Sequence, residues 1–249
     1  MNDGNKKENT PYIGGIKDNY IDQLHGDFQL VSEIVLTQIK LASDLVLDNR
    51  NEEIIPQLKR NEKLINSLDV TIKEKVINAI MLFTPRAFDL RRLMAYHDMT
   101  ISMERIGDLI GNIAFALEEI DFSLTGFEKY KKPIDKMFMR TDQMLKNALF
   151  AFTGVSNEMA YDTILMDDKV DKLERKIERK LAEDFRNEVQ SMQSLVNIMN
   201  LNSISYYLER IGDKAVDIAE SAIYVIEGKD IRHAKEPKKT VSGEKSANE

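Results

Sequence analysis

The chain has 249 residues, of which 43% are hydrophobic and 31% charged, and its formal net charge is −7. It contains no Cys, which excludes disulfide scaffolds, thiol catalysis and metal sites built on Cys. The acidic balance argues against general nucleic-acid binding, because such binding needs a basic face that neutralises phosphates. The sequence shows neither a secretory signal nor an apolar run of about 18 residues. We therefore expect a cytoplasmic protein without a membrane span.

The first half of the chain predicts a tail followed by three helices. Residues 1–16 are polar and lack apolar periodicity, and they are interpreted as a disordered N-terminal tail. Apolar residues at helical spacing begin near Asp18 and, after a break at 48–51, continue through a second helix. Thr84 is interpreted as the N-cap of the third helix, with Pro85 at its first helical position.

The second half predicts the same order of elements. A break at Gly126 separates the third helix from three more, which extend to Gly228. Residues 229–249 are polar and predict a second disordered tail.

An internal repeat relates the two halves. The pentapeptide Glu104–Asp108 recurs 105 residues later as Glu209–Asp213, and the same offset relates segments of the preceding helices. A constant offset over separate segments is typical of tandem duplication. We therefore expect an all-α fold of two tandem three-helix bundles, over residues 17–122 and 123–228. The six long helices should be related by an internal pseudo-twofold axis.

Acidic side chains form a stripe on two helices of the second half. At 100° per residue, the acids of the last helix fall within about 80° of one another, opposite its apolar stripe. These acids are Glu209, Asp213, Asp217 and Glu220, and those on one face of the preceding helix are Asp167, Asp171, Glu174 and Glu178. Residues equidistant from the turn of an antiparallel hairpin lie level. This relation pairs Asp167 with Asp213, and Asp171 with Glu209.

The first half has fewer acidic residues at the corresponding positions. About a turn near residue 85, Glu62 lies level with Asp108, and Asn66 with Glu104. The first half has Asn66, Lys73, Asn112 and Phe115 where the second has Asp171, Glu178, Asp217 and Glu220. We therefore expect the second half to bind cations more strongly than the first.

Two interpretations of the acidic stripes remain open. They are either solvated charged faces, as amphipathic helices commonly have, or the walls of a groove whose repulsion is relieved by bound cations. Carboxylate-only ligation suits hard ions such as magnesium, calcium, manganese and oxidised iron. Gly107 and Gly212 interrupt helices beside these acids. Because glycine is unfavourable inside a helix, the two residues indicate either close approach of a ligand or backbone, or tight helix packing.

Two segments resemble the PhoU family of phosphate-specific transport accessory proteins. In the first half Thr84–Arg92 is followed by Glu104–Asp108, and in the second half the match is Tyr207–Glu220. The resemblance implies two symmetric three-helix bundles with metal clusters, possible ions being iron, manganese, magnesium or zinc. It places the metal ligands at Glu104, Asp108, Asp167, Asp171, Glu209, Asp213 and Glu62, whereas Asn66 departs from the pattern.

By the same resemblance, the protein is not an enzyme but a negative regulator of phosphate uptake and of the phosphate-starvation response. The implied role is to link the phosphate ABC transporter to a membrane sensor histidine kinase at the cytoplasmic face, and a homodimer is expected. Two other functions remain open. One is a hydrolase or redox enzyme that uses carboxylate-bound metal, and the other is a helical interaction protein whose acids only solubilise it.

Overall fold

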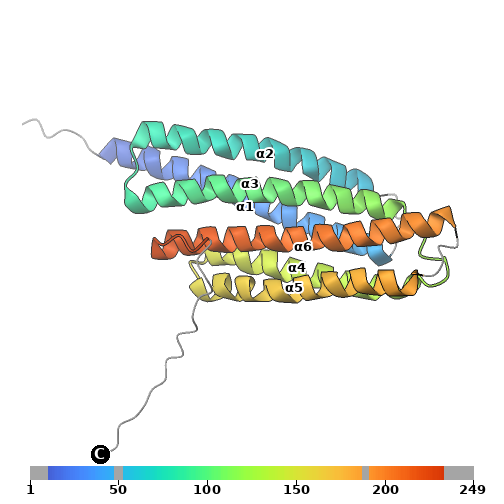
Figure 1. Ribbon diagram of the computed structural model, residues 1–249. Coiled ribbons are helices and arrows are strands. Elements are labelled where there is room, and N and C mark those ends of the chain that lie inside the picture. Colours follow the sequence, from blue (N-terminus) through green and yellow to red (C-terminus); the bar gives the residue numbers. More distant parts are fainter. Residues whose placement is uncertain (1–10, 48–52, 187–190, 233–249) are drawn as a thin grey trace, which may run out of the picture.

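The computed structural model describes residues 11–47, 53–186 and 191–232, and within these ranges its regular elements are all helical (Figure 1). The elements are α1 (Pro11–Leu47), α2 (Ile54–Phe83), α3 (Ala87–Glu118), η1 (Glu128–Tyr130), α4 (Lys131–Thr153), α5 (Asn157–Asp184) and α6 (Met192–Glu227). The predicted all-α fold with six long helices is therefore confirmed. None of the helices in these ranges combines the length and the apolar character that a bilayer span requires.

The helices form two bundles that pack side by side. α1, α2 and α3 contact one another, as do α4, α5 and α6, and the bundles meet mainly where α3 lies against α6. Figure 1 shows α3 and α6 running in opposite directions along an elongated molecule. The α2–α3 and α5–α6 hairpins therefore turn at opposite ends, as expected for a pseudo-twofold pair.

An aromatic cluster joins the two bundles. Phe28 from α1, Tyr96 from α3 and Phe152 from α4 pack edge to face, with ring centroids 5.0 to 5.2 Å apart. Such pairs contribute about 0.5–1.5 kcal/mol beyond the burial of their area. The Tyr96 hydroxyl lies 2.9 Å from His25 Nδ1, so the polar end of this buried ring is also satisfied.

The α2–α3 turn differs from the prediction. Thr84 has left-handed backbone (φ 44°) and ends α2 instead of capping α3. A proline disfavours helical backbone at the residue before it, and α3 begins only at Ala87, after the N-cap Arg86. The predicted N-cap at Thr84 and the first helical position at Pro85 are therefore wrong.

The N-terminal boundary also differs from the prediction. α1 begins at Pro11, so residues 11–16, which were expected to belong to the tail, are helical. Proline is well suited to the start of a helix, since the N–H that it lacks would have no intrahelical partner there. Residues 1–10 and the predicted break at 48–51 lie outside the described residues.

Two predicted breaks are confirmed. Gly126, with φ 91°, lies in the connection between α3 and α4. Gly228, with φ 72°, ends α6, and its N–H donates to the Tyr224 carbonyl oxygen at 3.0 Å. Both glycines adopt left-handed backbone, which other residues adopt only with strain. Residues 233–249 of the predicted C-terminal tail lie outside the described residues.

Candidate functional site

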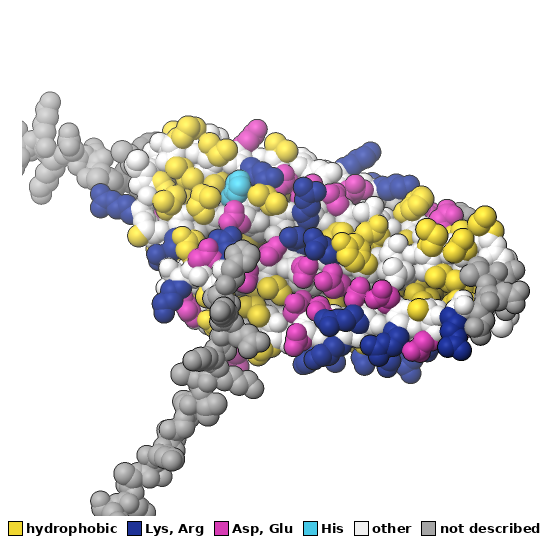
Figure 2. All heavy atoms as spheres, viewed as in Figure 1, with side chains coloured by type: hydrophobic (Ala, Val, Ile, Leu, Met, Phe, Trp, Pro, Cys, Tyr) yellow, Lys and Arg dark blue, Asp and Glu magenta, His cyan; other side chains and the backbone are white. Residues whose placement is uncertain are grey.

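The four strongest predicted ligands lie together between α5 and α6, and we call them the second cluster. α5 contributes Asp167 and Asp171, and α6 contributes Glu209 and Asp213. Asp167 reaches across to α6, since its Oδ1 lies 3.6 Å from the position that a Cβ on Gly212 would take. Figure 2 shows acidic side chains gathered over the middle of the face that α5 and α6 form.

Burial and mutual repulsion disfavour the charged forms of these carboxyls. Burial is the main cause that raises the pKa of Asp167 to about 6, and repulsion from Asp171 and Asp213 adds to it. Burial also raises the pKa of Glu209 to about 7, again reinforced by Asp213 and Asp171. The pKa of Asp213 is raised as well, with burial as the largest cause. At neutral pH the second cluster therefore concentrates negative charge. Binding of protons or of a cation would relieve the repulsion between its carboxylates.

Arginines of the same helices pair with two of the four carboxylates. Arg175 lies 2.6 Å from Asp171 Oδ2, and Arg210 lies 3.3 Å from Asp213 Oδ2. Asp167, in contrast, has a buried Oδ1 without a hydrogen-bond partner. A buried carboxylate oxygen without a partner is costly. Asp167 is therefore the member of the second cluster that would gain most from an added cation.

The donor set of the second cluster fits a hard cation. It consists of crowded carboxylate oxygens, which are the ligands that hard ions prefer. Within the described residues, no group of three or more His, Asp or Glu side chains is arranged to hold a metal ion as the side chains stand. Ligation by all four residues would require Asp171 and Asp213 to exchange their arginine partners for the ion.

Acids of the first unit (α1 to α3) also pair with basic side chains. The pKa of Glu104 on α3 is raised by burial first, and then by repulsion from Asp108 and Asp69. Arg105 lies 3.6 Å from the Glu104 carboxylate and 3.8 Å from that of Asp108, although its exposure makes these pairs weak. Lys73 pairs with Asp69 at 2.8 Å. Two basic side chains thus share the charge of these three acids.

Sequence reasoning missed Asp69, which lies close enough to Glu104 to act on its pKa together with Asp108. Its Oδ1 is buried and has no hydrogen-bond partner, as for Asp167. The repeat offset carried the necessary signal, because it relates Asp69 to Glu174 of the predicted acidic stripe on α5. The pKa of Glu174 is itself raised by burial and by repulsion from neighbouring acids.

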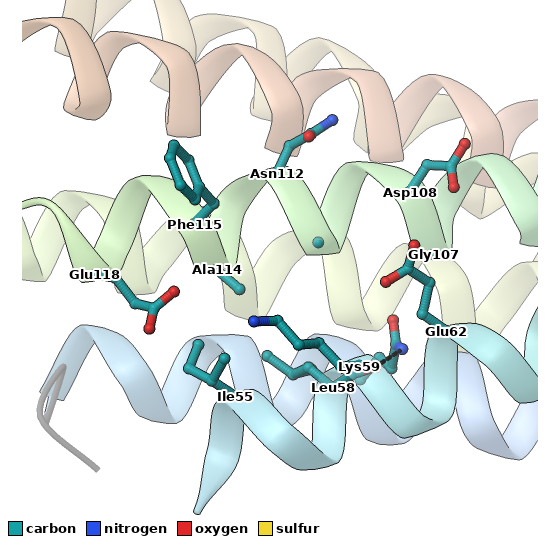
Figure 3. Close-up of a pocket in the computed structure, with 12 residues that line it drawn as sticks. Ile55, Leu58, Lys59, Glu62, Gly107, Asp108, Asn112, Ala114, Phe115 and Glu118 are labelled. Atoms are coloured by element: carbon teal, nitrogen blue, oxygen red, sulfur yellow. Dashed lines mark hydrogen bonds between the residues drawn. The ribbon is translucent and has the colours of Figure 1, made fainter. Parts of the chain in front are cut away.

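Glu62 on α2 lies level with Asp108 on α3, as predicted, and both line one pocket (Figure 3). The Glu62 carboxylate turns toward Gly111, since its Oε2 lies 3.9 Å from the position of a Cβ there. Gly111 lies one helical turn beyond Gly107. Glu62 thus belongs to this pocket as well as to the predicted ligand set.

The two mid-helix glycines serve different neighbours. A Cβ on Gly107 would lie 3.2 Å from Ile65 Cδ1, so tight helix packing accounts for that glycine. A Cβ on Gly212 would meet Asp167 Oδ1 and Met144 Cε at 3.6 Å, which is ordinary contact. The sequence left two alternatives open. Tight helix packing explains Gly107, whereas Gly212 lies beside a candidate metal ligand.

Comparison with known proteins identifies the family. The PhoU domain matches twice, at residues 28–117 and 134–222. The phosphate-specific transport system accessory protein PhoU homolog 1 of Methanothermobacter thermautotrophicus is 32% identical over 209 residues, which cover 83% of this chain and 92% of that protein. The PhoU of Escherichia coli is 26% identical over 230 residues, which cover 86% and 91%.

Solved structures agree on the fold. The crystal structure of PhoU from Pseudomonas aeruginosa matches with a TM-score of 0.75 at 22% sequence identity, and the match covers 85% of this chain and 99% of that one. The two domain matches together span well over half of the sequence. The chain therefore belongs to the PhoU family.

Proposed function

We propose that this protein is a non-enzymatic regulator that restrains phosphate uptake and the phosphate-starvation response, and that a hard cation bound at the second cluster is part of its working form. The observation that carries the proposal is the double match to the PhoU domain. The relatives that share this domain are named phosphate-specific transport system accessory proteins.

The second cluster supports the metal part of the proposal. Asp167, Asp171, Glu209 and Asp213 would hold one or more ions, of which iron, manganese, magnesium and zinc are the candidates. Glu104, Asp108 and Glu62 would form a weaker site in the first unit. Burial and repulsion together raise the pKa values of Asp167 and Glu209, and a bound cation would cancel the repulsion. It would thereby order the surface between α5 and α6.

The proposed output is protein–protein contact at the cytoplasmic face of the membrane. There a homodimer would link the phosphate ABC transporter to a sensor histidine kinase. Exposed apolar side chains at corresponding places in the two units support paired docking surfaces. They are Leu90 and Met94 near the α2–α3 turn, and Leu195 and Met199 near the α5–α6 turn. Such patches mark interaction sites when they are contiguous.

A deletion strain grown in ample phosphate tests the regulatory part of the proposal. We expect derepressed phosphate uptake and starvation-gene output, both restored by the parent chain. The metal part is tested by complementation with Glu209→Gln combined with Asp213→Asn. These isosteres remove the charge while preserving helicity, and we expect them to fail.

Asp168→Asn is the matched control for that complementation. Asp168 is next to Asp167 in the chain, but its side chain is 84% exposed and only loosely paired with Lys172 at 3.9 Å. It should complement fully. Normal phosphate uptake and starvation-gene output in the deletion strain would contradict the regulatory role. Full complementation by the double variant would contradict only the role of the metal.

A further inference from the structure

The first unit contains a pocket of about 370 Å³ between α2 and α3, to which α1 contributes Gln38 (Figure 3). A water molecule takes about 30 Å³ of liquid volume, and small-molecule sites begin at about 300 Å³. The pocket is therefore large enough for an organic ligand. It extends from Asp108 along α3 to Glu118, beyond the acid pair at Glu104 and Asp108.

Gln38 gives this pocket a hydrogen-bond acceptor without a partner. The residue is 1% exposed, and its Nε2 donates to the Leu58 carbonyl oxygen at 3.0 Å. Because a carbonyl oxygen only accepts, the amide must present its NH₂ group to Leu58. Gln38 Oε1 is then left buried and without a hydrogen-bond partner. Such an oxygen is costly to bury alone, so an occupant that donates a hydrogen bond would be stabilised here.

The charge of the pocket favours a cationic occupant. Three carboxylates line it, from Glu62, Asp108 and Glu118, against one ammonium group from Lys59. Figure 3 shows Glu62 and Glu118 at opposite ends, with the Lys59 side chain reaching in between them. The pocket thus already accommodates an alkylammonium group that belongs to the chain itself.

The shape and walls of the pocket favour an elongated aliphatic ligand. Between its acidic ends, Ile55, Leu58 and Ala114 provide apolar surface that methylene groups can cover. Glu62 lies against Gly111, and Glu118 is two helical turns further along α3, which is about 10 Å. An extended linear polyamine matches this alternation, with ammonium groups at the carboxylates and Gln38 Oε1, and methylenes on the apolar wall.

The second unit keeps the acids that correspond to Glu62 and Asp108, as Asp167 and Asp213, but lacks other features of this pocket. By the repeat offset, Ile164 stands in place of Lys59, Val216 in place of Gly111, and Ile223 in place of Glu118. Met144 lies beside Gly212, where its Cε comes within 3.6 Å of a Cβ position. The buried positions of α4 follow those of α1 at an offset of 106, which places the buried Met144 where the first unit has Gln38. The pocket is therefore a property of the first unit and not of the repeat.

We propose that the pocket formed by Gln38, Lys59, Glu62, Gly111 and Glu118 binds a linear aliphatic polyamine. The site is separate from the second cluster, although it shares Glu62 and Asp108 with the weaker metal site proposed for the first unit. Binding should weaken as salt concentration rises, because ion pairs supply part of the affinity.

Isothermal titration of spermidine into the EDTA-treated full-length chain tests this proposal. We expect one binding event per chain. Gln38→Met removes the free acceptor with a side chain of similar shape, and should weaken binding about tenfold or more, as for loss of a hydrogen bond to a charged group. Gly111→Val should also weaken binding by narrowing the pocket. A Cβ at Gly111 would meet nothing closer than the Glu62 carboxylate at 3.9 Å, so there is room for a side chain to start at this position.

Glu118→Gln is the surface variant that decides the test if Gln38→Met does not fold, and Glu119→Gln is its matched control. Both remove one charge at the end of α3, but Glu119 does not line the pocket. Spermidine affinity should fall for the first and stay unchanged for the second. The proposal is overturned if spermidine does not bind, if all variants bind it equally, or if Mn²⁺ alone gives heat that Gln38→Met removes. A chain with Asp167→Asn and Asp213→Asn should keep its spermidine binding, which separates this site from the second cluster.

Discussion

The two units share helix order and a pentapeptide, yet they surround their mid-helix glycines differently. In the second unit Gly212 is flanked by Met144, Val170 and the half-buried Asp167 carboxylate, so acids lie directly against apolar side chains. In the first unit the corresponding region holds the polar side chains of Gln38 and Lys59 as well as carboxylates. The comparison indicates that duplication preserved the backbone and the apolar core. The charged surfaces above that core diverged in each copy.

The largest expected effect that separates the units is stabilisation by metal. At Mn²⁺ concentrations about 100 times Kd, an ion that binds only the folded chain adds about 2.7 kcal/mol to the free energy of unfolding. Glu209→Gln with Asp213→Asn should abolish this gain, whereas Glu104→Gln with Asp108→Asn should keep most of it. Thermal unfolding followed by circular dichroism, with and without Mn²⁺, measures both. Equal losses from the two double variants would contradict the predicted inequality of the units.

Met144→Gln and Gln38→Met exchange the buried side chains of the two units, and we expect them to lower the free energy of unfolding by different amounts. Met144 is fully buried, so Met144→Gln places an amide without a partner in an apolar site and should cost about 1–3 kcal/mol. Gln38→Met removes an acceptor that already lacks a partner, although it also frees the Leu58 carbonyl. Its cost should stay below about 1 kcal/mol. Urea unfolding of the two variants checks the difference, and similar costs would show that the two positions are equivalent.

The cation-free chain should lose stability as pH rises. The folded-state pKa values of Asp167 (about 6) and Glu209 (about 7) lie above the unfolded values, which are near 4. The folded state therefore keeps protons that the unfolded state has released. This contribution is fully present below about pH 4 and is lost as pH rises through the two folded-state pKa values.

Urea midpoints measured in EDTA between about pH 5 and pH 8 report this loss. The variant that combines Glu209→Gln with Asp213→Asn should give a flatter profile than the parent. The variant with Glu104→Gln and Asp108→Asn should change the profile less. A parent chain whose stability rises over this range while the second-cluster variant follows it in parallel would refute the assignment.

The smallest effect concerns the two glycines. Gly212→Ala should stabilise the chain by up to about 1 kcal/mol, since alanine is the better helix former and meets only ordinary contacts. Gly107→Ala should gain less, because the new methyl group would press on Ile65 at 3.2 Å. Thermal unfolding of both variants in EDTA compares them. A larger gain at position 107 would indicate that Ile65 moves aside freely.

The internal repeat is the reason that much of the fold and of the acidic site could be predicted from the sequence. Helical periodicity and the recurrence of Glu104–Asp108 as Glu209–Asp213 suffice for the six helices and for the facing acids. The α2–α3 turn was misread because Thr84 before Pro85 has the chemistry of an N-cap, yet it ends the preceding helix in left-handed backbone. The signals of a capping residue and of a proline stop coincide at that position.

Gln38 could not be recognised from pattern alone. A single polar residue in a long helix reads as a surface position, and only packing against α2 shows that it is buried. The pairing of Asp171 with Arg175 joins residues one helical turn apart, so it can be expected from the sequence. Its effect on the charge of the whole cluster cannot. Which carboxylates remain unpaired depends on side-chain positions that spacing does not determine.

An anomalous difference map from crystals soaked in Mn²⁺ tests most directly whether the second cluster is the principal cation site. We expect the strongest peak between α5 and α6, in contact with Asp167 and at least two of Asp171, Glu209 and Asp213, with Arg175 and Arg210 turned away. Peaks only in the first unit, or none between α5 and α6 at saturating Mn²⁺, would contradict this expectation.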